Sequence, residues 1–217
     1  MFTTEQNDTL CRVEGEAPMG QLMCRHWLPA CASDEVVEPD GTPVRTRLLG
    51  EDVVVFRDTN GELGALAELC PHRKASLAFG RNEECGLRCL YHGWKFAVDG
   101  TVMEMASEPN SERKVGAFKH TAYPVHESGG FVWVYLGPIE TMTPFEPPAW
   151  APTPDTKISV VKIHAPCNWA QVLEGSIDSA HSSSLHSSNM PSAEVEGSTA
   201  TGDLWLRPSN DKSPRLE

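Results

Sequence analysis

Two short stretches decide the fold, Cys70-Pro71-His72-Arg73 and Cys89-Leu90-Tyr91-His92-Gly93-Trp94. Each stretch contains one cysteine and one histidine, separated by a single residue in the first and by two residues in the second. Two thiolates and two imidazoles on two tight loops are the ligand set of a four-coordinate metal site. The sequence therefore predicts a metal centre at these two loops.

Two kinds of metal centre use such a ligand set. One is a tetrahedral zinc ion. The other is a [2Fe–2S] cluster of the Rieske type, in which two cysteines hold one iron and two histidines hold the other. The single residue between Cys70 and His72 is shorter than the roughly two to four residues of a usual zinc knuckle, which favours the cluster. Pro71 stiffens the first loop and Gly93-Trp94 follows the second, as in a Rieske motif.

Length and charge limit the remaining possibilities. A chain of 217 residues has room for one large or two small domains. A formal net charge of −12 argues against nucleic acid or an anionic membrane as a partner. No apolar run approaches the roughly 18–20 residues that span a bilayer, and residues 1–18 lack the apolar core of a signal peptide. Seven cysteines without such a signal fit a reducing compartment, so we expect a cytoplasmic protein.

Short apolar runs separated by turn dipeptides predict β-hairpins through the middle of the chain. The expected strands are residues 53–56, 63–66, 94–98, 101–105 and 131–135, and the expected hairpin turns are Asn60-Gly61 and Asp99-Gly100. Strands at this density indicate a small antiparallel sandwich or barrel. Such a frame holds metal loops rigidly.

Composition divides the chain into four predicted segments. Residues 1–44 are expected to be an N-terminal helical extension, opened by a capping box of Thr3 with Gln6. Residues 45–137 form the metal-binding β domain. Residues 138–156 contain six prolines and are expected to be a semi-rigid linker. Residues 157–217 begin a second domain, with a strand at 158–164 and a helix at 168–186.

The helix predicted at 168–186 carries a second group of chemical residues. Asp178 and His181 are three apart and would share one side of a helix. His186 could reach the same metal if the helix loosens near Ser182–Ser184, which are poor helix formers. Two histidines and a carboxylate form the facial triad of non-haem Fe(II) oxygenases, although zinc suits the pair equally well. A one-electron cluster in the same chain favours iron, because O₂ activation at Fe(II) needs single electrons.

Together these two motifs resemble those of the oxygenase (alpha) subunit of Rieske non-haem iron aromatic ring-hydroxylating oxygenases. The second motif is matched by Asn168-Trp169, Glu174-Gly175, Asp178, His181 and His186. The similarity is greatest to the phthalate 4,5-dioxygenase-like branch, through residues 24–30, 79–84 and 106–109. The resemblance implies a Rieske domain at 45–137 and, at 157–217, the start of a helix-grip, START-like α+β catalytic domain, so that the chain would be the N-terminal portion of a longer subunit.

The resemblance also implies a role for each residue. Cys70 and Cys89 would bind the inner iron of the cluster, and His72 and His92 the outer iron. His181 and His186 would bind mononuclear Fe(II), with the third, carboxylate ligand beyond the end of the chain. Asp178 would bridge a cluster histidine of a neighbouring subunit to an iron-ligand histidine and carry electrons between subunits. The alternative for Asp178 is a carboxylate that only orients His181.

Such a protein would be a ring-shaped homo-oligomer, a trimer or stacked trimers, that receives electrons from NADH through a separate flavin and iron–sulfur reductase. With O₂ as co-substrate it would cis-dihydroxylate a small, phthalate-like aromatic carboxylate. Arg207 is our candidate for pairing with that carboxylate, and a solvated surface arginine is the alternative. Two other functions stay open, a Rieske-type O-demethylase or monooxygenase and a Rieske electron-transfer protein with an accidental histidine pair.

Overall fold

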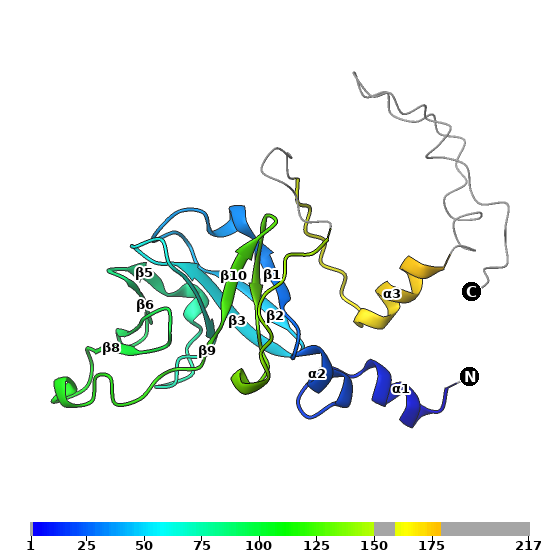
Figure 1. The fold of residues 1–217 in the computed structure, drawn as a ribbon. Coiled ribbons are helices and arrows are strands. Elements are labelled where there is room, and N and C mark those ends of the chain that lie inside the picture. The colour runs from blue at the N-terminus through cyan, green and yellow to red at the C-terminus, as the bar shows by residue number, and fades with distance from the viewer. Residues whose placement is uncertain (1, 150–158, 179–217) are drawn as a thin grey trace, which may run out of the picture. The chain divides into compact units, whose positions relative to one another are not determined.

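The computed structural model describes residues 2–149 and 159–178, and Figure 1 shows their arrangement. The chain divides into two compact units, Met1–Ile163 and His164–Glu217. The first unit contains all the strands of the described chain, and α3 (Trp169–Ile177) belongs to the second.

The N-terminal segment is helical at its start but contributes a strand farther on. In α1 (Thr4–Cys11) the predicted capping box is confirmed: the Thr3 hydroxyl accepts from the Gln6 amide at 3.2 Å and the Gln6 side chain accepts from the Thr3 amide at 2.9 Å. α2 (Pro18–Met23) follows. The expected helical extension then differs from the structure, because β1 (Leu28–Ala32) pairs antiparallel with β11 (Phe131–Val134). Ala30, Cys31 and Ala32 are buried by this pairing, so the segment belongs to the sheet.

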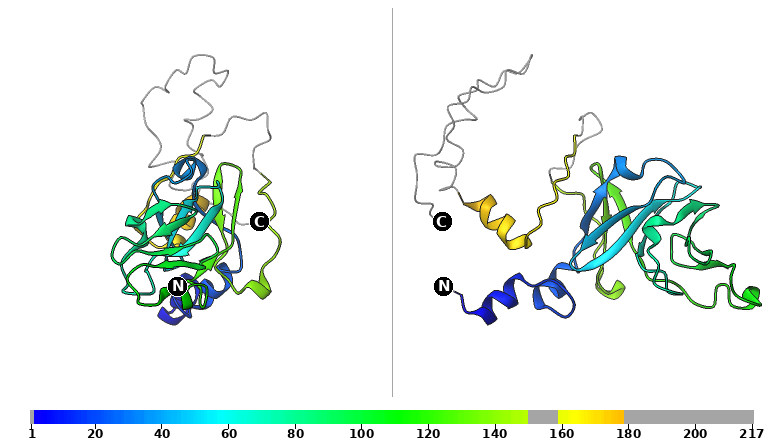
Figure 2. Two further views of the ribbon diagram at one scale, coloured as in Figure 1. Left: turned by 90° about the vertical axis from the view of Figure 1, so that its left-hand side faces the viewer. Right: turned by 180° about the vertical axis from the view of Figure 1, so that it is seen from behind.

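In the described part of the chain the strands form three sheets whose pairings are antiparallel, which confirms the predicted antiparallel β fold. Figure 2 shows the strands from two further directions. The first sheet has the order β1-β11-β10, with β10 at Val125–Ser128. The second is β2 (Val44–Leu48), β3 (Glu51–Arg57), β4 (Leu63–Ala67) and β9 (Ala122–Tyr123). The third is β5 (Arg81–Glu83), β6 (Gly86–Arg88), β7 (Trp94–Phe96) and β8 (Val102–Met105). Short 3₁₀ turns occur at Ser33–Val36, Leu77–Phe79, Ser111–Arg113 and Ile139–Thr141.

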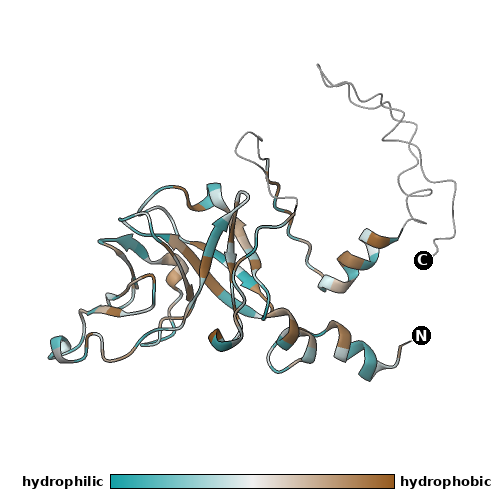
Figure 3. Cartoon of the chain, viewed as in Figure 1, coloured by the Kyte–Doolittle hydropathy of each residue, from teal (hydrophilic) through white to brown (hydrophobic). Residues whose placement is uncertain are grey.

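Strand β3 separates two hydrophobic cores. Its side chains alternate between its faces. Val54 and Phe56 enter a core that also contains Cys70 and Cys89, whereas Val53 and Val55 enter a second core against β1 and β11. Burial on both faces explains why β3 is an unbroken apolar run rather than an alternating one, and Figure 3 shows apolar residues along the strands of this unit. The two candidate cysteine ligands, Cys70 and Cys89, therefore belong to the same core.

The first part of the proline-rich segment lies against the first sheet. The Trp27 indole N–H donates to the Thr143 carbonyl at 3.1 Å. The Phe145 ring stacks on His126 with a centroid distance of 4.1 Å and meets Trp27 edge-on at 5.6 Å. Through these contacts residues 143–145 pack against Trp27 and against His126 of β10. Residues 150–156 of the expected linker lie outside the described residues.

The strand predicted at 158–164 is wrong over its described part, because residues 159–164 have no strand structure. Val161 and Ile163 are 79% and 83% exposed. A β-branched run becomes a strand only when another strand accepts its hydrogen bonds, and the described residues place none beside it. Within the described ranges there is also no helix long and apolar enough to cross a membrane.

The helix predicted at 168–186 is confirmed only at its beginning. Asn168 caps α3 by accepting from the Ala170 amide at 2.9 Å. The helix ends at Ile177, and Asp178 is its C-cap with extended backbone, φ −78° and ψ 108°. Gly175 is a poor helix former, and the Ser176 hydroxyl bonds back to the Val172 carbonyl at 2.8 Å, which competes with regular helix. The expectation that Asp178 lies on the helix is therefore wrong, and residues 179–186 lie outside the described residues.

Candidate metal centre

The first ligand loop connects β4 to β5 and closes on itself. The Cys70 amide donates to the Ala75 carbonyl and the Lys74 amide donates to the Cys70 carbonyl, both at 2.9 Å. Lys74 has φ +56°, a left-handed conformation that reverses the chain in little space. Pro71 and His72 sit inside this closed turn. The loop is therefore held in shape in part by hydrogen bonds of its own backbone.

A buried carboxylate anchors the base of the first loop. Glu68 is 4% exposed and accepts from the Arg45 guanidinium at 2.6 Å and from the Ser76 hydroxyl at 2.5 Å. The Leu77 amide also donates to the Glu68 carbonyl at 2.8 Å. A buried carboxylate needs such partners, since burial without them is costly. Glu68 thus ties both ends of the loop to the second sheet.

The second ligand loop connects β6 to β7 and is held by Arg88. The Cys89 amide donates to the Trp94 carbonyl at 2.8 Å, and the Gly93 amide donates to the Cys89 carbonyl at 3.0 Å. The Arg88 guanidinium donates to the Gly93 carbonyl at 3.1 Å, to Glu104 at 2.8 Å and to Glu83 at 2.5 Å. The second loop is therefore fixed from outside as well as by its own backbone.

Arg88 and the acidic residues around it stabilise each other's charged forms. Hydrogen bonds from Arg88 and Lys95 lower the pKa of Glu104 to about 2. The hydrogen bonds to Glu104 and Glu83 raise the pKa of Arg88 above its ordinary value, against the effect of burial. Arg88 and Lys95 are 9% and 4% exposed, so these carboxylates offset the cost of burying two cations.

The two loops bring Cys70 close to Cys89 and His72 close to His92. Cys70 and Cys89 are each 2% exposed. The backbone amides of His72 and Arg73 act to lower the pKa of the Cys70 thiol. Burial, together with the charge of nearby Cys89, raises the pKa of the Cys70 thiol to about 11. The His72 and His92 rings lie 4.6 Å apart between centroids, inclined at 66°.

The ring nitrogens of the two histidines provide a test of what the site can hold. Nδ1 of His72 and Nδ1 of His92 are both buried and have no hydrogen-bond partner. An unsatisfied buried polar atom costs about 1–3 kcal/mol, and a metal ion bound at each nitrogen would remove that cost. Paired buried thiols beside two such nitrogens fit a cluster with two sulfur-bound and two nitrogen-bound positions.

A single zinc ion and a two-iron cluster require different arrangements of these four side chains. A tetrahedral zinc requires its ligands to converge on one point. In a two-iron cluster the cysteines and histidines instead bind in pairs, each pair to its own iron.

Aromatic rings surround the histidines. The Trp94 indole stacks on His72 at 4.9 Å with an interplanar angle of 3°, and the Tyr91 ring lies 3.8 Å from the His92 ring. Sequence reasoning missed the contributions of Trp94, Arg88 and Glu68, because each depends on contacts made only in the fold. The sequence around Arg88 and Glu68 contains no motif or spacing that predicts these contacts.

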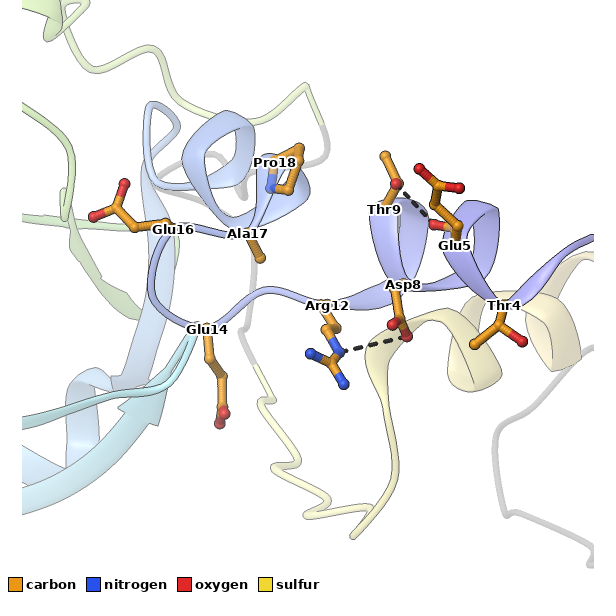
Figure 4. Close-up of a pocket in the computed structure, with 9 residues that line it drawn as sticks. All are labelled: Thr4, Glu5, Asp8, Thr9, Arg12, Glu14, Glu16, Ala17 and Pro18. Carbon is orange, nitrogen blue, oxygen red and sulfur yellow. Dashed lines mark hydrogen bonds and ion pairs between the residues drawn. The ribbon is translucent and has the colours of Figure 1, made fainter.

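The structure does not place the other predicted site residues relative to this centre. Asp178 caps α3 in the second unit, and the positions of the units relative to each other are not defined. His181, His186 and Arg207 lie outside the described residues. A separate open hollow of about 630 Å³ lies beside α1 and α2 and contains no predicted ligand (Figure 4).

A β frame carrying two Cys/His loops defines the class of this protein. A sequence profile of the Rieske [2Fe-2S] domain matches residues 9–123, more than half of the chain, so the chain belongs to the Rieske [2Fe-2S] domain family. A second profile, described as LigXa C-terminal domain like, matches residues 134–217. These matches confirm the resemblance that the two motifs indicated.

Among known proteins, the chain is 61% identical over all 217 residues to the phthalate 4,5-dioxygenase oxygenase subunit of Pseudomonas putida, covering 49% of that protein. It is 40% identical over 90% of its length to the 3-chlorobenzoate-3,4-dioxygenase oxygenase subunit of Comamonas testosteroni, covering 45% of it. The terminal oxygenase of carbazole 1,9a-dioxygenase from Nocardioides aromaticivorans IC177 is a structural neighbour, with a TM-score of 0.63, 28% identity, and coverage of 77% of this chain and 45% of that one. The chain spans about half the length of the curated relatives it matches.

Proposed function

We propose that this chain carries the Rieske cluster of the oxygenase component of a multicomponent aromatic ring-hydroxylating dioxygenase. The observation that carries the proposal is the pairing of two buried thiols, Cys70 and Cys89, with two buried and unpartnered imidazole nitrogens. The similarity to dioxygenase oxygenase subunits supports it.

Each of the four residues has a definite part in this proposal. Cys70 and Cys89 hold the inner iron, and His72 and His92 hold the outer iron through Nδ1. The bound cluster supplies a carrier for one electron at a time. The chain keeps water from the two sulfurs by burying both cysteines, and the amides of His72 and Arg73 stabilise the negative charge on the Cys70 sulfur.

The remaining roles come from the family resemblance and its second motif. His181 and His186 bind the mononuclear iron, and Asp178 links a cluster histidine of one subunit to an iron-ligand histidine of the next. That role requires a homo-oligomer, a trimer or stacked trimers.

The proposal also includes a substrate class and an electron donor. The 61% identity to a phthalate dioxygenase subunit supports a phthalate-like aromatic carboxylate as substrate, with Arg207 pairing with its carboxylate. The electrons come from NADH through a flavin and iron–sulfur reductase in the cytoplasm. Turnover of phthalate under ¹⁸O₂ by the oxygenase component containing this chain would place both labelled atoms in one cis-diol, whereas a monooxygenase or O-demethylase incorporates one.

The cluster itself is tested directly on this chain. We expect anaerobically purified protein to contain about two irons and two labile sulfides per chain, and its reduced EPR spectrum to show coupling to two histidine nitrogens. Cys89→Ser should lose the cluster. Cys85→Ser is the matched control, since Cys85 lies near the same sheet but outside both ligand loops, and it should retain the cluster. A colourless wild-type protein with stoichiometric zinc and no labile sulfide would refute the proposal.

A further inference from the structure

The two candidate cluster histidines have different surroundings. His72 is held by its own chain on three sides: the Trp94 indole stacks on its face, the His92 ring meets it edge-on, and a carboxylate approaches its outer nitrogen. For His92 the described residues offer only ring contacts, with Tyr91 and with His72, and no acidic partner. Among the described residues, His72 therefore has a carboxylate beside it and His92 does not.

The carboxylate beside His72 belongs to Glu108. Its Oε1 lies 3.6 Å from Nε2 of His72. At that distance the two groups interact electrostatically but are slightly too far apart for a direct hydrogen bond. A small movement of the Glu108 side chain or a bridging water would connect them. The side chains of His72 and Glu108 are 19% and 26% exposed, so water screens the contact only in part.

Glu108 is itself held in place from two directions. Its backbone amide donates to the Met105 carbonyl at 2.9 Å, which fixes it directly after β8. Its second oxygen, Oε2, lies 3.4 Å from the Lys114 ammonium. One oxygen of the carboxylate therefore pairs with Lys114 while the other faces the imidazole.

A carboxylate at Nε2 decides which nitrogen of His72 is free. A carboxylate only accepts, so it favours the tautomer in which Nε2 carries the hydrogen and Nδ1 presents a lone pair. Nδ1 is the buried atom without a partner. Such carboxylate–histidine–metal arrangements orient the ring and make it a better ligand.

We propose that Glu108 is a positioning residue that seats His72 on the outer iron and makes the cluster harder to reduce. This inference rests on the proposed function, because it assumes a Rieske cluster at the four residues above. A fixed negative charge beside an outer-iron ligand disfavours the addition of an electron. The same contact leaves His92 as the cluster histidine without an intrachain acid among the described residues.

The test compares Glu108→Gln with Glu112→Gln in the full chain. Both changes remove one negative charge from the segment after β8, but Glu112 is exposed and contacts neither histidine. In Glu108→Gln we expect the ratio of reduced to oxidised cluster at a fixed solution potential to rise about tenfold, which is a positive shift of about 59 mV for a one-electron couple. Pulsed EPR on ¹⁵N-histidine protein should show altered coupling for one histidine nitrogen and unchanged coupling for the other. Glu112→Gln should match the wild type in both measurements.

Two further variants complete the test. Glu108→Asp keeps the charge and should restore the wild-type potential, and Lys114→Gln should shift the potential in the negative direction. If Glu108→Gln loses the cluster while Glu108→Asp retains it, the carboxylate is needed to seat His72, which supports the proposal. The proposal is overturned if Glu108→Gln and Glu112→Gln behave alike, or if both Glu108 variants lose the cluster. Wild-type protein without a cluster would instead refute the proposed function itself.

Discussion

His120 is a buried imidazole that lies outside both ligand loops. It is 7% exposed, and its Nε2 lies 2.7 Å from the Ala67 carbonyl. The carbonyl can only accept, so Nε2 carries the hydrogen. Burial lowers the pKa of His120 and the positive charge of Lys74 lowers it further, against an opposing effect of the Ala67 carbonyl. His120 is therefore neutral in the folded protein at neutral pH.

This lowered pKa makes stability depend on pH. The unfolded chain binds a proton at His120 near pH 6.5, whereas the folded chain binds it only at lower pH. As the pH falls below about 6.5, the unfolded state takes up more protons, and the free energy of unfolding falls by up to about 1.4 kcal/mol per pH unit. We expect the urea midpoint of the wild type to fall more steeply between pH 8 and pH 5 than that of His120→Gln. Equal slopes would show that another group is responsible.

Single residues also show how far the candidate site could be predicted. The four ligands could be named from the sequence, because their chemistry is fixed by residue type and local spacing. Glu108 could not, since it lies 36 positions after His72 and meets it only when β8 is in place. Arg88 likewise acts through Glu83 and Glu104 on two other strands. The ligand roles and the roles of His181, His186, Asp178 and Arg207 stay predictions.

At the scale of elements, the turn between β7 and β8 depends on a close backbone approach. Gly100 has φ +79°, and a Cβ built there would lie 2.1 Å from the His120 carbonyl oxygen. The Gly100 carbonyl also accepts from the His120 amide at 2.7 Å. The turn and the segment before β9 are therefore packed backbone against backbone, with no room for a side chain.

We expect Gly100→Ala to lower the free energy of unfolding by about 3 kcal/mol or more, because a left-handed alanine and a backbone clash add together. Gly61→Ala is the matched control. Gly61 has φ +83° in the β3–β4 hairpin, but a Cβ added there would meet nothing within 4 Å, so its cost should be only about 1–2 kcal/mol. Urea unfolding measures both. Equal costs for the two variants would mean that the close approach at Gly100 relaxes easily.

The same elements explain which strands could be predicted. The hairpins of β3 with β4 and of β7 with β8 were found because Asn60-Gly61 and Asp99-Gly100 mark their turns. β1 was missed because its pairing with β11 joins residues about 100 positions apart, which no local pattern encodes. The run at 158–164 has strand composition but no partner among the described residues, and composition alone does not supply one.

At the scale of the whole first unit, one of the two hydrophobic cores contains candidate metal ligands and the other contains none. One core contains Cys70, Cys89 and Trp94, so candidate ligands form part of its wall. The other core is built from β1, β11 and one face of β3 and contains none of the candidate ligands. Loss of the cluster would remove the metal from Cys70 and Cys89 in the wall of the first core, whereas no candidate ligand lies in the second core.

Removing the iron with a chelator should therefore loosen one side of the unit and leave the other folded. In hydrogen exchange of metal-free against metal-loaded protein, we expect the amides of β7 and of the Cys89–Trp94 loop to lose protection. The amides of Val132 and Val134 in β11 should stay protected, because their core and their pairing with β1 do not involve the ligands. Reconstitution with iron and sulfide should restore the protection of β7. Equal loss of protection in β7 and β11 would show instead that the metal holds the entire unit together, and that the β frame does not prepare the two ligand loops before the metal binds.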